Sequence, residues 1–125
     1  FEKAWGGISS IQFTLPVIWT ECKARGFSID QLINWMSTEP AKFIGKDQHK
    51  GQIFPGFDAD LVCWNPDEKY MIQKEAIHHK NKLTPYEGES LYGIVNATFL
   101  RGQKVYENGD FLGNPTGKII LNNNG

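Results

Sequence analysis

The first part of the chain carries apolar residues at the spacing of an α-helix. Over residues 14–25 they fall on roughly one face, and Pro16 lies in the first turn, where its missing N–H costs little. Gly26 follows at the position of a left-handed C-terminal cap. The residues of this apolar face are Leu15, Val17, Ile18, Trp19 and Cys22. The pattern therefore predicts a helix over residues 14–25.

A second helix is predicted from Ser28, because Gln31 three residues later completes a capping box. Its expected buried stripe, with Trp35 beside it, consists of Ile29, Leu32, Ile33 and Met36. A third, short helix is expected over residues 40–44, where Gly45 would end it. Helices with broad apolar faces and no sheet of their own form a poor independent domain. We therefore expect these faces to pack on something that this chain does not contain.

After residue 48 the pattern changes to short β-prone runs separated by turns. Pro55-Gly56 suits a type II turn, and both Arg101-Gly102 and Asn108-Gly109 are typical of tight turns between strands. The predicted strands cover residues 60–64, 69–72, 91–100, 103–106 and 118–121. We therefore divide the chain into a helical part, 1–47, and a small, mostly antiparallel β domain, 48–125.

Composition excludes several classes of function. A net charge of −1 gives no electrostatic reason to expect a nucleic acid or an acidic membrane surface as a partner. No stretch approaches the ~20 apolar residues that span a bilayer, and no secretory signal is visible. Cys22 and Cys63 form no C-x-x-C pair and are too few for a disulfide scaffold. We expect two reduced cysteines in an intracellular protein, without distinguishing cytoplasm from organelle.

Few residues are candidates for chemistry. His78 and His79 are adjacent, so on a strand they would point to opposite faces and could not easily share a metal. Together with His49 they are expected to be solvated or hydrogen-bonded rather than metal ligands. Asp58 and Asp60 flank a turn that enters a strand, where aspartate typically accepts backbone N–H bonds. We therefore assign neither a catalytic nor a metal-binding residue.

Gly6 and Gly7 form the remaining candidate site. Two glycines are too short for a phosphate-binding loop. Because glycine has no Cβ, their backbone N–H and C=O groups could still approach a small ligand closely. The alternative is a flexible loop without a ligand.

Four segments resemble a known family. Residues 50–62, K-G-x-I-x-P-G-x-D-A-D-L-V, resemble the hairpin at which the amidohydrolase superfamily passes from its catalytic barrel into its small β-sandwich. Residues 100–106, L-R-G-Q-K-V-Y, match a late strand–turn–strand of the cyclic amidases in that superfamily. Residues 4–12, A-W-G-G-I-S-S-I-Q, and residues 79–88, H-K-N-K-L-T-P-Y-E-G, are similar to allantoinase segments. Together these segments favour the allantoinases within the superfamily.

The resemblance implies an α+β fragment. Residues 1–47 would be the last helices of a (β/α)8 metal-dependent hydrolase barrel, and residues 48–125 a mostly antiparallel β-sandwich. The implied reaction opens the hydantoin ring of allantoin to allantoate at a binuclear zinc centre. Its ligands and its catalytic aspartate would precede Phe1, so the chain alone is expected to be inactive. The resemblance transfers only a substrate-binding role, to the backbone of Gly6 and Gly7.

The implied partners are a cyclic ureide, the remainder of the barrel and further copies of the same protein in a homo-oligomer. Two alternatives stay open. A hydantoinase or dihydropyrimidinase would act on a related ring. A non-catalytic, β-rich interaction module would instead be a monomer without a large exposed apolar helix face.

Overall fold

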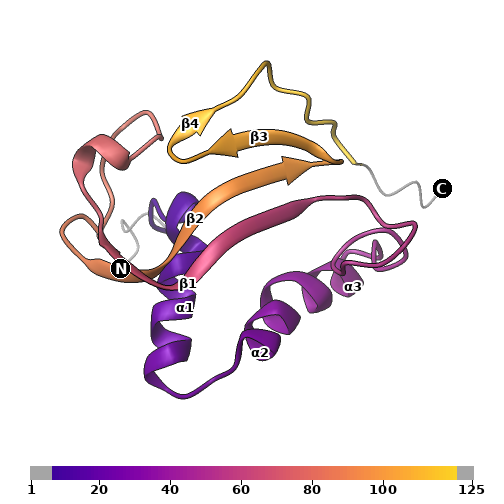
Figure 1. The fold of residues 1–125 in the computed structure, drawn as a ribbon, viewed down its shortest axis with the longest axis horizontal. Coiled ribbons are helices and arrows are strands. Elements are labelled where there is room, and N and C mark those ends of the chain that lie inside the picture. The colour runs from indigo at the N-terminus through magenta and orange to yellow at the C-terminus, as the bar shows by residue number, and fades with distance from the viewer. Residues whose placement is uncertain (1–6, 121–125) are drawn as a thin grey trace, which may run out of the picture.

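The computed structural model describes residues 7–120, which form a helical segment followed by a four-stranded sheet. The strands are β1 (Leu61–Met71), β2 (Ser90–Leu100), β3 (Gln103–Glu107) and β4 (Asp110–Phe111). They lie in the order β1-β2-β3-β4, and each pairs antiparallel with the next. Figure 1 shows helices α2 and α3 on the β1 side of the sheet, with β4 at the opposite edge. The predicted antiparallel sheet is thus confirmed.

Helix α1 (Thr14–Ala24) follows a short 3₁₀ turn, η1 (Ile11–Phe13), and matches the first predicted helix. It ends as expected at Gly26, whose φ is +77°, and the N–H of Phe27 donates to the carbonyl of Cys22 at 2.9 Å. This bond is the 6→1 hydrogen bond of a Schellman motif, and it satisfies one of the carbonyls that every helix end leaves free. The end of α1 is therefore determined by local sequence.

The second and third predicted helices form one continuous helical run. It comprises α2 (Ile29–Ile33), a π-helical segment η2 (Asn34–Thr38) and α3 (Glu39–Phe43). The capping box at Ser28 and Gln31 is present, with both hydrogen bonds made. Pro40 lacks an N–H and would clash with the carbonyl four residues earlier in a regular helix. Ahead of Pro40, the N–H of Glu39 donates to the carbonyl of Asn34, five residues earlier. This wider, π-helical turn accommodates the proline ring.

The predicted buried stripe of the second helix is wrong for two of its four members, Ile29 and Ile33. Leu32 is 1% exposed, whereas Ile29 is 36%, Ile33 47% and Trp35 46% exposed. Of the predicted stripe, Leu32 and Met36 pack against the core of residues 7–120, whereas Ile29 and Ile33 do not. An apolar helix face therefore remains uncovered in the described part of the chain.

Two predicted strands, 60–64 and 69–72, join into the single strand β1. The β1–β2 register shifts between Asn65 and Lys69, where the strand bulges around Pro66. The predicted strand at 118–121 is wrong over residues 118–120, which form no strand, and Leu121 lies outside the described residues. Its β-prone composition finds no pairing partner there, since Ile119 is 89% exposed.

The predicted turns are confirmed. Positive φ angles occur at Arg101-Gly102 and at Asn108-Gly109, as tight hairpin turns require. At Pro55-Gly56 the N–H of Phe57 donates to the carbonyl of Phe54 at 3.0 Å, and Gly56 has a φ of +91°. These turns depend on two residues each, which explains why sequence alone identifies them.

Two groups of buried side chains form the core between the helical segment and the sheet. One group consists of Phe13, Ile72, Ile77 and Leu91, and the other of Trp19, Cys22 and Leu32, with Trp64 and Tyr92 against it. Trp19 also donates its indole N–H to the carbonyl of Pro66 at 2.7 Å. Gly93 lies against the indoles of Trp19 and Trp64 and has a φ of +98°. A Cβ there would lie 3.1 Å from the Trp64 ring and 3.2 Å from the Trp19 ring, so the packing requires glycine.

Candidate functional site

The predicted substrate-binding loop precedes η1 and is described from Gly7 onward. Gly6 lies outside the described residues. Gly7 is exposed and has a φ of +83°, a backbone conformation that side-chain-bearing residues rarely adopt. No atom of the described residues lies within 4 Å of a Cβ built on Gly7. The side-chain position of Gly7 is therefore open within the described residues.

This rim loop, residues 7–10, is attached to a segment far away in sequence. The hydroxyl of Thr84 donates to the carbonyl of Ser9 at 2.8 Å. Thr84 is 8% exposed, which makes it the buried polar residue of the described core. The next carbonyl, of Ser10, accepts from the N–H of Phe13 at 2.8 Å and from the hydroxyl of Thr14 at 3.1 Å. The rim loop is thus held at two successive carbonyls.

Gln12 provides a second long-range attachment. Its amide nitrogen donates to the carbonyl of Ala76 at 2.7 Å, and its amide oxygen accepts from the N–H of His78 at 2.9 Å. Sequence reasoning assigned no role to Thr84 or Gln12. The available signal was their place in the two allantoinase-like segments, 79–88 and 4–12, which the structure brings into contact.

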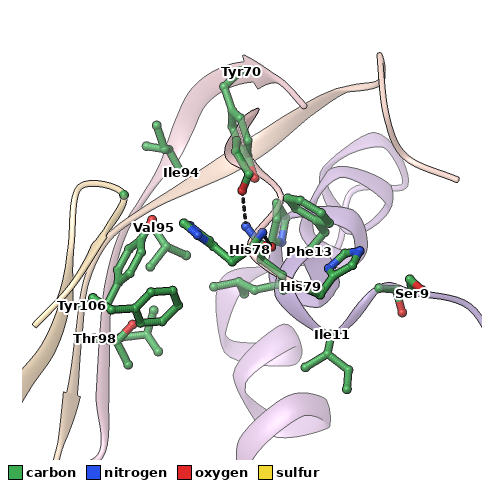
Figure 2. Close-up of a pocket in the computed structure, with 18 of the residues that line it drawn as sticks. Ser9, Ile11, Phe13, Tyr70, His78, His79, Ile94, Val95, Thr98 and Tyr106 are labelled. Atoms are coloured by element: carbon green, nitrogen blue, oxygen red, sulfur yellow. Dashed lines mark hydrogen bonds between the residues drawn. The ribbon is translucent and has the colours of Figure 1, made fainter. Parts of the chain in front are cut away.

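A large hollow opens beside the rim loop. Figure 2 shows Ser9, Ile11 and Phe13 on one side of it, Val95, Thr98 and Tyr106 on the other, and His78 between them. Its volume is about 1400 Å³, larger than the roughly 300–1,000 Å³ typical of small-molecule pockets. Apolar side chains dominate its lining, and Ile11 is 93% exposed. The hollow is thus mainly apolar and larger than a typical pocket for one small molecule.

Charge is scarce at the sheet side of this hollow. Burial raises the pKa of the Tyr70 hydroxyl to about 12, and the nearby hydroxyl of Tyr106 adds to the effect. Tyr70 therefore stays neutral at physiological pH. A neutral phenol with this pKa is no general base, so the hollow offers no acid–base pair through Tyr70.

The side chains of the three histidines make different contacts. The ring of His78 packs edge-on against Phe111, with centroids 4.9 Å apart, and Nε2 of His79 lies 3.0 Å from the carbonyl oxygen of Leu83. His49 is exposed in the turn region before β1. Within residues 7–120, no group of three or more His, Cys, Asp or Glu side chains is placed to hold a metal ion.

Asp58 and Asp60 belong to an ion-pair cluster. The ammonium of Lys50 lies 2.7 Å from Asp58 and 2.5 Å from Asp60. The hydrogen bond from Lys50 lowers the pKa of the Asp60 carboxyl, and the hydrogen bond to Asp58 is the largest cause of the raised pKa of Lys50. Asp60 also accepts the N–H of Arg101 at 2.8 Å, which confirms the predicted backbone bond. The cluster connects the 50–60 segment to the β2–β3 turn through Asp60.

No helix in residues 7–120 combines the length and the apolar character needed to cross a membrane.

Comparison with known proteins supports the sequence motifs. The chain is 48% identical over 120 residues to a "probable allantoinase 2" of Dictyostelium discoideum and 42% identical over 120 residues to an allantoinase of Streptomyces avermitilis. Each alignment covers 96% of this chain, but only 23% and 26% of the respective relative. The chain therefore spans about a quarter of the length of the curated relatives it matches. The predicted resemblance to allantoinases is confirmed.

Solved structures with a similar fold include two hydantoinases (dihydropyrimidinases). The chain superposes on a D-hydantoinase (dihydropyrimidinase) from Thermus sp. with a TM-score of 0.81 and 30% identity, covering 91% of this chain and 25% of that one. For the L-hydantoinase (dihydropyrimidinase) from Arthrobacter aurescens the TM-score is 0.77, with 30% identity over 89% of this chain and 25% of that one. The family described as "Amidohydrolase family" matches residues 8–105. The chain belongs to the amidohydrolase family.

Proposed function

We propose that this chain is part of an allantoinase, a cyclic amide hydrolase that opens the hydantoin ring of allantoin to give allantoate. The observation that carries the proposal is the contact between the two allantoinase-like segments. Residues 4–12 and 79–88 resemble allantoinases separately, and the bond from Thr84 to Ser9 joins them in space. The 42–48% identity to proteins named as allantoinases, over 96% of the chain, supports the same substrate.

Residues 1–47 would supply the last helices of the catalytic barrel, and residues 48–125 most of a β-sandwich. The uncovered apolar face of α2, with Ile33 at 47% exposure, supports the first assignment, since such a face needs a packing partner. The apolar hollow on the sheet supports the second, because a sandwich buries one sheet face against another. The remainder of the barrel and further copies of the protein would be its partners.

The binuclear zinc centre implied by the resemblance does not fit residues 7–120, which offer no cluster of suitable side chains. Its ligands would therefore lie outside these residues, and we derive no catalytic step through them. The contribution of this chain would be substrate recognition. A cyclic ureide alternates N–H donors and C=O acceptors along its edge, and the backbone of Gly6 and Gly7 would pair with that edge. The open, left-handed conformation at Gly7 is compatible with such an approach.

A hydantoinase or dihydropyrimidinase is the second candidate, favoured by the names of the similar solved structures. A non-catalytic interaction module is disfavoured by the exposed apolar helix face. The free thiols of Cys22 and Cys63 support an intracellular location.

The discriminating experiment measures ring opening by the full-length polypeptide that carries this chain. Allantoin, hydantoin and dihydrouracil would be compared at matched metal content. The proposal predicts the highest kcat/KM for allantoin. A higher kcat/KM for dihydrouracil or hydantoin would favour the second candidate, and no turnover of any ring would contradict both.

A further inference from the structure

The bond between Thr84 and Ser9 suggests a role for the β domain in substrate binding. We propose that Thr84 is a positioning residue, which fixes the rim loop, residues 7–10, so that the backbone of Gly7 faces the substrate in one conformation. The inference rests on the proposed function. Thr84 itself would not touch the substrate, because its hydroxyl is used on the carbonyl of Ser9.

The rim loop needs an external support. Gly7 has a positive φ and no described atom within 4 Å of a Cβ built there, so packing does not restrain it. Ser9 is exposed, and its carbonyl is held by a side chain 75 residues further along the chain. Restraint two residues from Gly7 reduces the conformations that the loop must give up when a ligand binds.

Thr84 can provide this support because its own position is fixed by the core. Thr84 is 8% exposed, and its carbonyl accepts the N–H of Glu87 at 3.3 Å. The same turn is tied to Ile72, whose carbonyl accepts the N–H of Gly88 at 2.9 Å and whose N–H donates to Glu89 at 2.9 Å. Ile72 is 1% exposed in the core group that also contains Phe13. An uninterrupted series of bonds thus connects the buried core to the rim loop.

The attachment of Gln12 to Ala76 and His78 serves the same end at the other side of the loop. The side chains of Gln12 and Thr84 therefore join residues 7–13 to residues 76–84 independently of each other. A binding loop held at both sides loses less conformational freedom when its ligand binds, which favours affinity.

The test compares Thr84→Val with Thr84→Ser in the full-length polypeptide that carries this chain. Valine keeps the shape of threonine without the hydroxyl, and serine keeps the hydroxyl. Thr38→Val is the matched control, because it removes a similar bond, from Thr38 to the carbonyl of Gly51 at 3.2 Å, far from the rim loop in sequence. KM and kcat for allantoin, bound metal and melting temperature would be measured for each variant.

The proposal predicts that Thr84→Val raises KM about threefold to tenfold, the range expected for one lost hydrogen bond, with kcat and bound metal unchanged. Thr84→Ser should restore KM to within about twofold of the wild type, and Thr38→Val should leave KM unchanged. Equal KM for Thr84→Val and Thr38→Val, or an equal rise in Thr84→Val and Thr84→Ser, would overturn the proposal.

Backbone hydrogen exchange provides a readout independent of activity. The amides of residues 8–12 should exchange several-fold faster in Thr84→Val than in Thr38→Val, because local opening loses one restraint. Unchanged exchange would overturn the positioning role even in an active enzyme. If the wild type opened no cyclic amide, the proposed function would fail, and faster exchange in Thr84→Val would still support the positioning of the loop.

Discussion

Replacing Gly93 by alanine tests the packing of α1 on the sheet. A residue with a Cβ is disfavoured at the φ of +98° observed at Gly93, at a cost of about 1–2 kcal/mol. The new methyl group would also lie 3.1 Å from the Trp64 ring and 3.2 Å from the Trp19 ring, too close for both indoles to stay in place. Forcing an extra methyl group into a packed core costs about 1–3 kcal/mol. Gly93→Ala should therefore lower the free energy of unfolding by about 2–5 kcal/mol.

Gly109→Ala separates the two contributions. Gly109 has a φ of +105°, close to that of Gly93, but no described atom within 4 Å of a Cβ built there. Gly109→Ala should therefore lower the free energy of unfolding only by the cost of the positive φ, about 1–2 kcal/mol. Urea unfolding followed by tryptophan fluorescence would measure both variants. Equal losses in the two variants would refute the close approach of Gly93 to the indoles.

Three further predictions follow from the charges, the cap and the exposed face. Lys50 lowers the pKa of Asp60, so the pair stabilises the fold above the unfolded value of about 3.9, and this contribution disappears as the pH falls through the lowered pKa. Lys50→Met should thus destabilise at pH 7 and much less at about pH 2, as urea midpoints at both values would show; equal losses would contradict the pairing. Ser28→Ala should cost about 0.5–2 kcal/mol in thermal or urea unfolding, because the capping bond to Gln31 is lost, whereas an unchanged midpoint would contradict it. The 125-residue chain should bind an apolar dye such as ANS, and Ile33→Glu should reduce the fluorescence; no dye binding would contradict an exposed apolar face.

Short sequence motifs predict most of the helix ends and turns of the fold. The capping box at Ser28, the turn at Gly26 and the Asn108-Gly109 hairpin each depend on a few adjacent residues, and the structure confirms them. The π-helical segment before Pro40 was not predicted, because its geometry depends on how the helix continues beyond the proline. The sequence pattern predicts two strands in place of the continuous strand β1, because residues 65–68, at its bulge, are not β-prone.

Non-local contacts account for what the sequence did not reveal at the site. Periodicity shows which side of α2 is apolar, but whether Ile33 is buried depends on what else is present to cover it. The bond from Thr84 to Ser9 joins residues 75 positions apart, and no spacing rule connects them. Gly6 and Gly7 were proposed from a motif, and their role in binding stays a prediction.

The most direct measurement is allantoate production by a chimera. In it, this chain replaces the matching quarter of the Streptomyces avermitilis allantoinase. If the chain supplies the rim loop and its support but no metal ligands, a folded, metal-loaded chimera should open allantoin, while the 125-residue chain alone should leave the ring closed. A folded, metal-loaded chimera without activity toward allantoin would contradict this account.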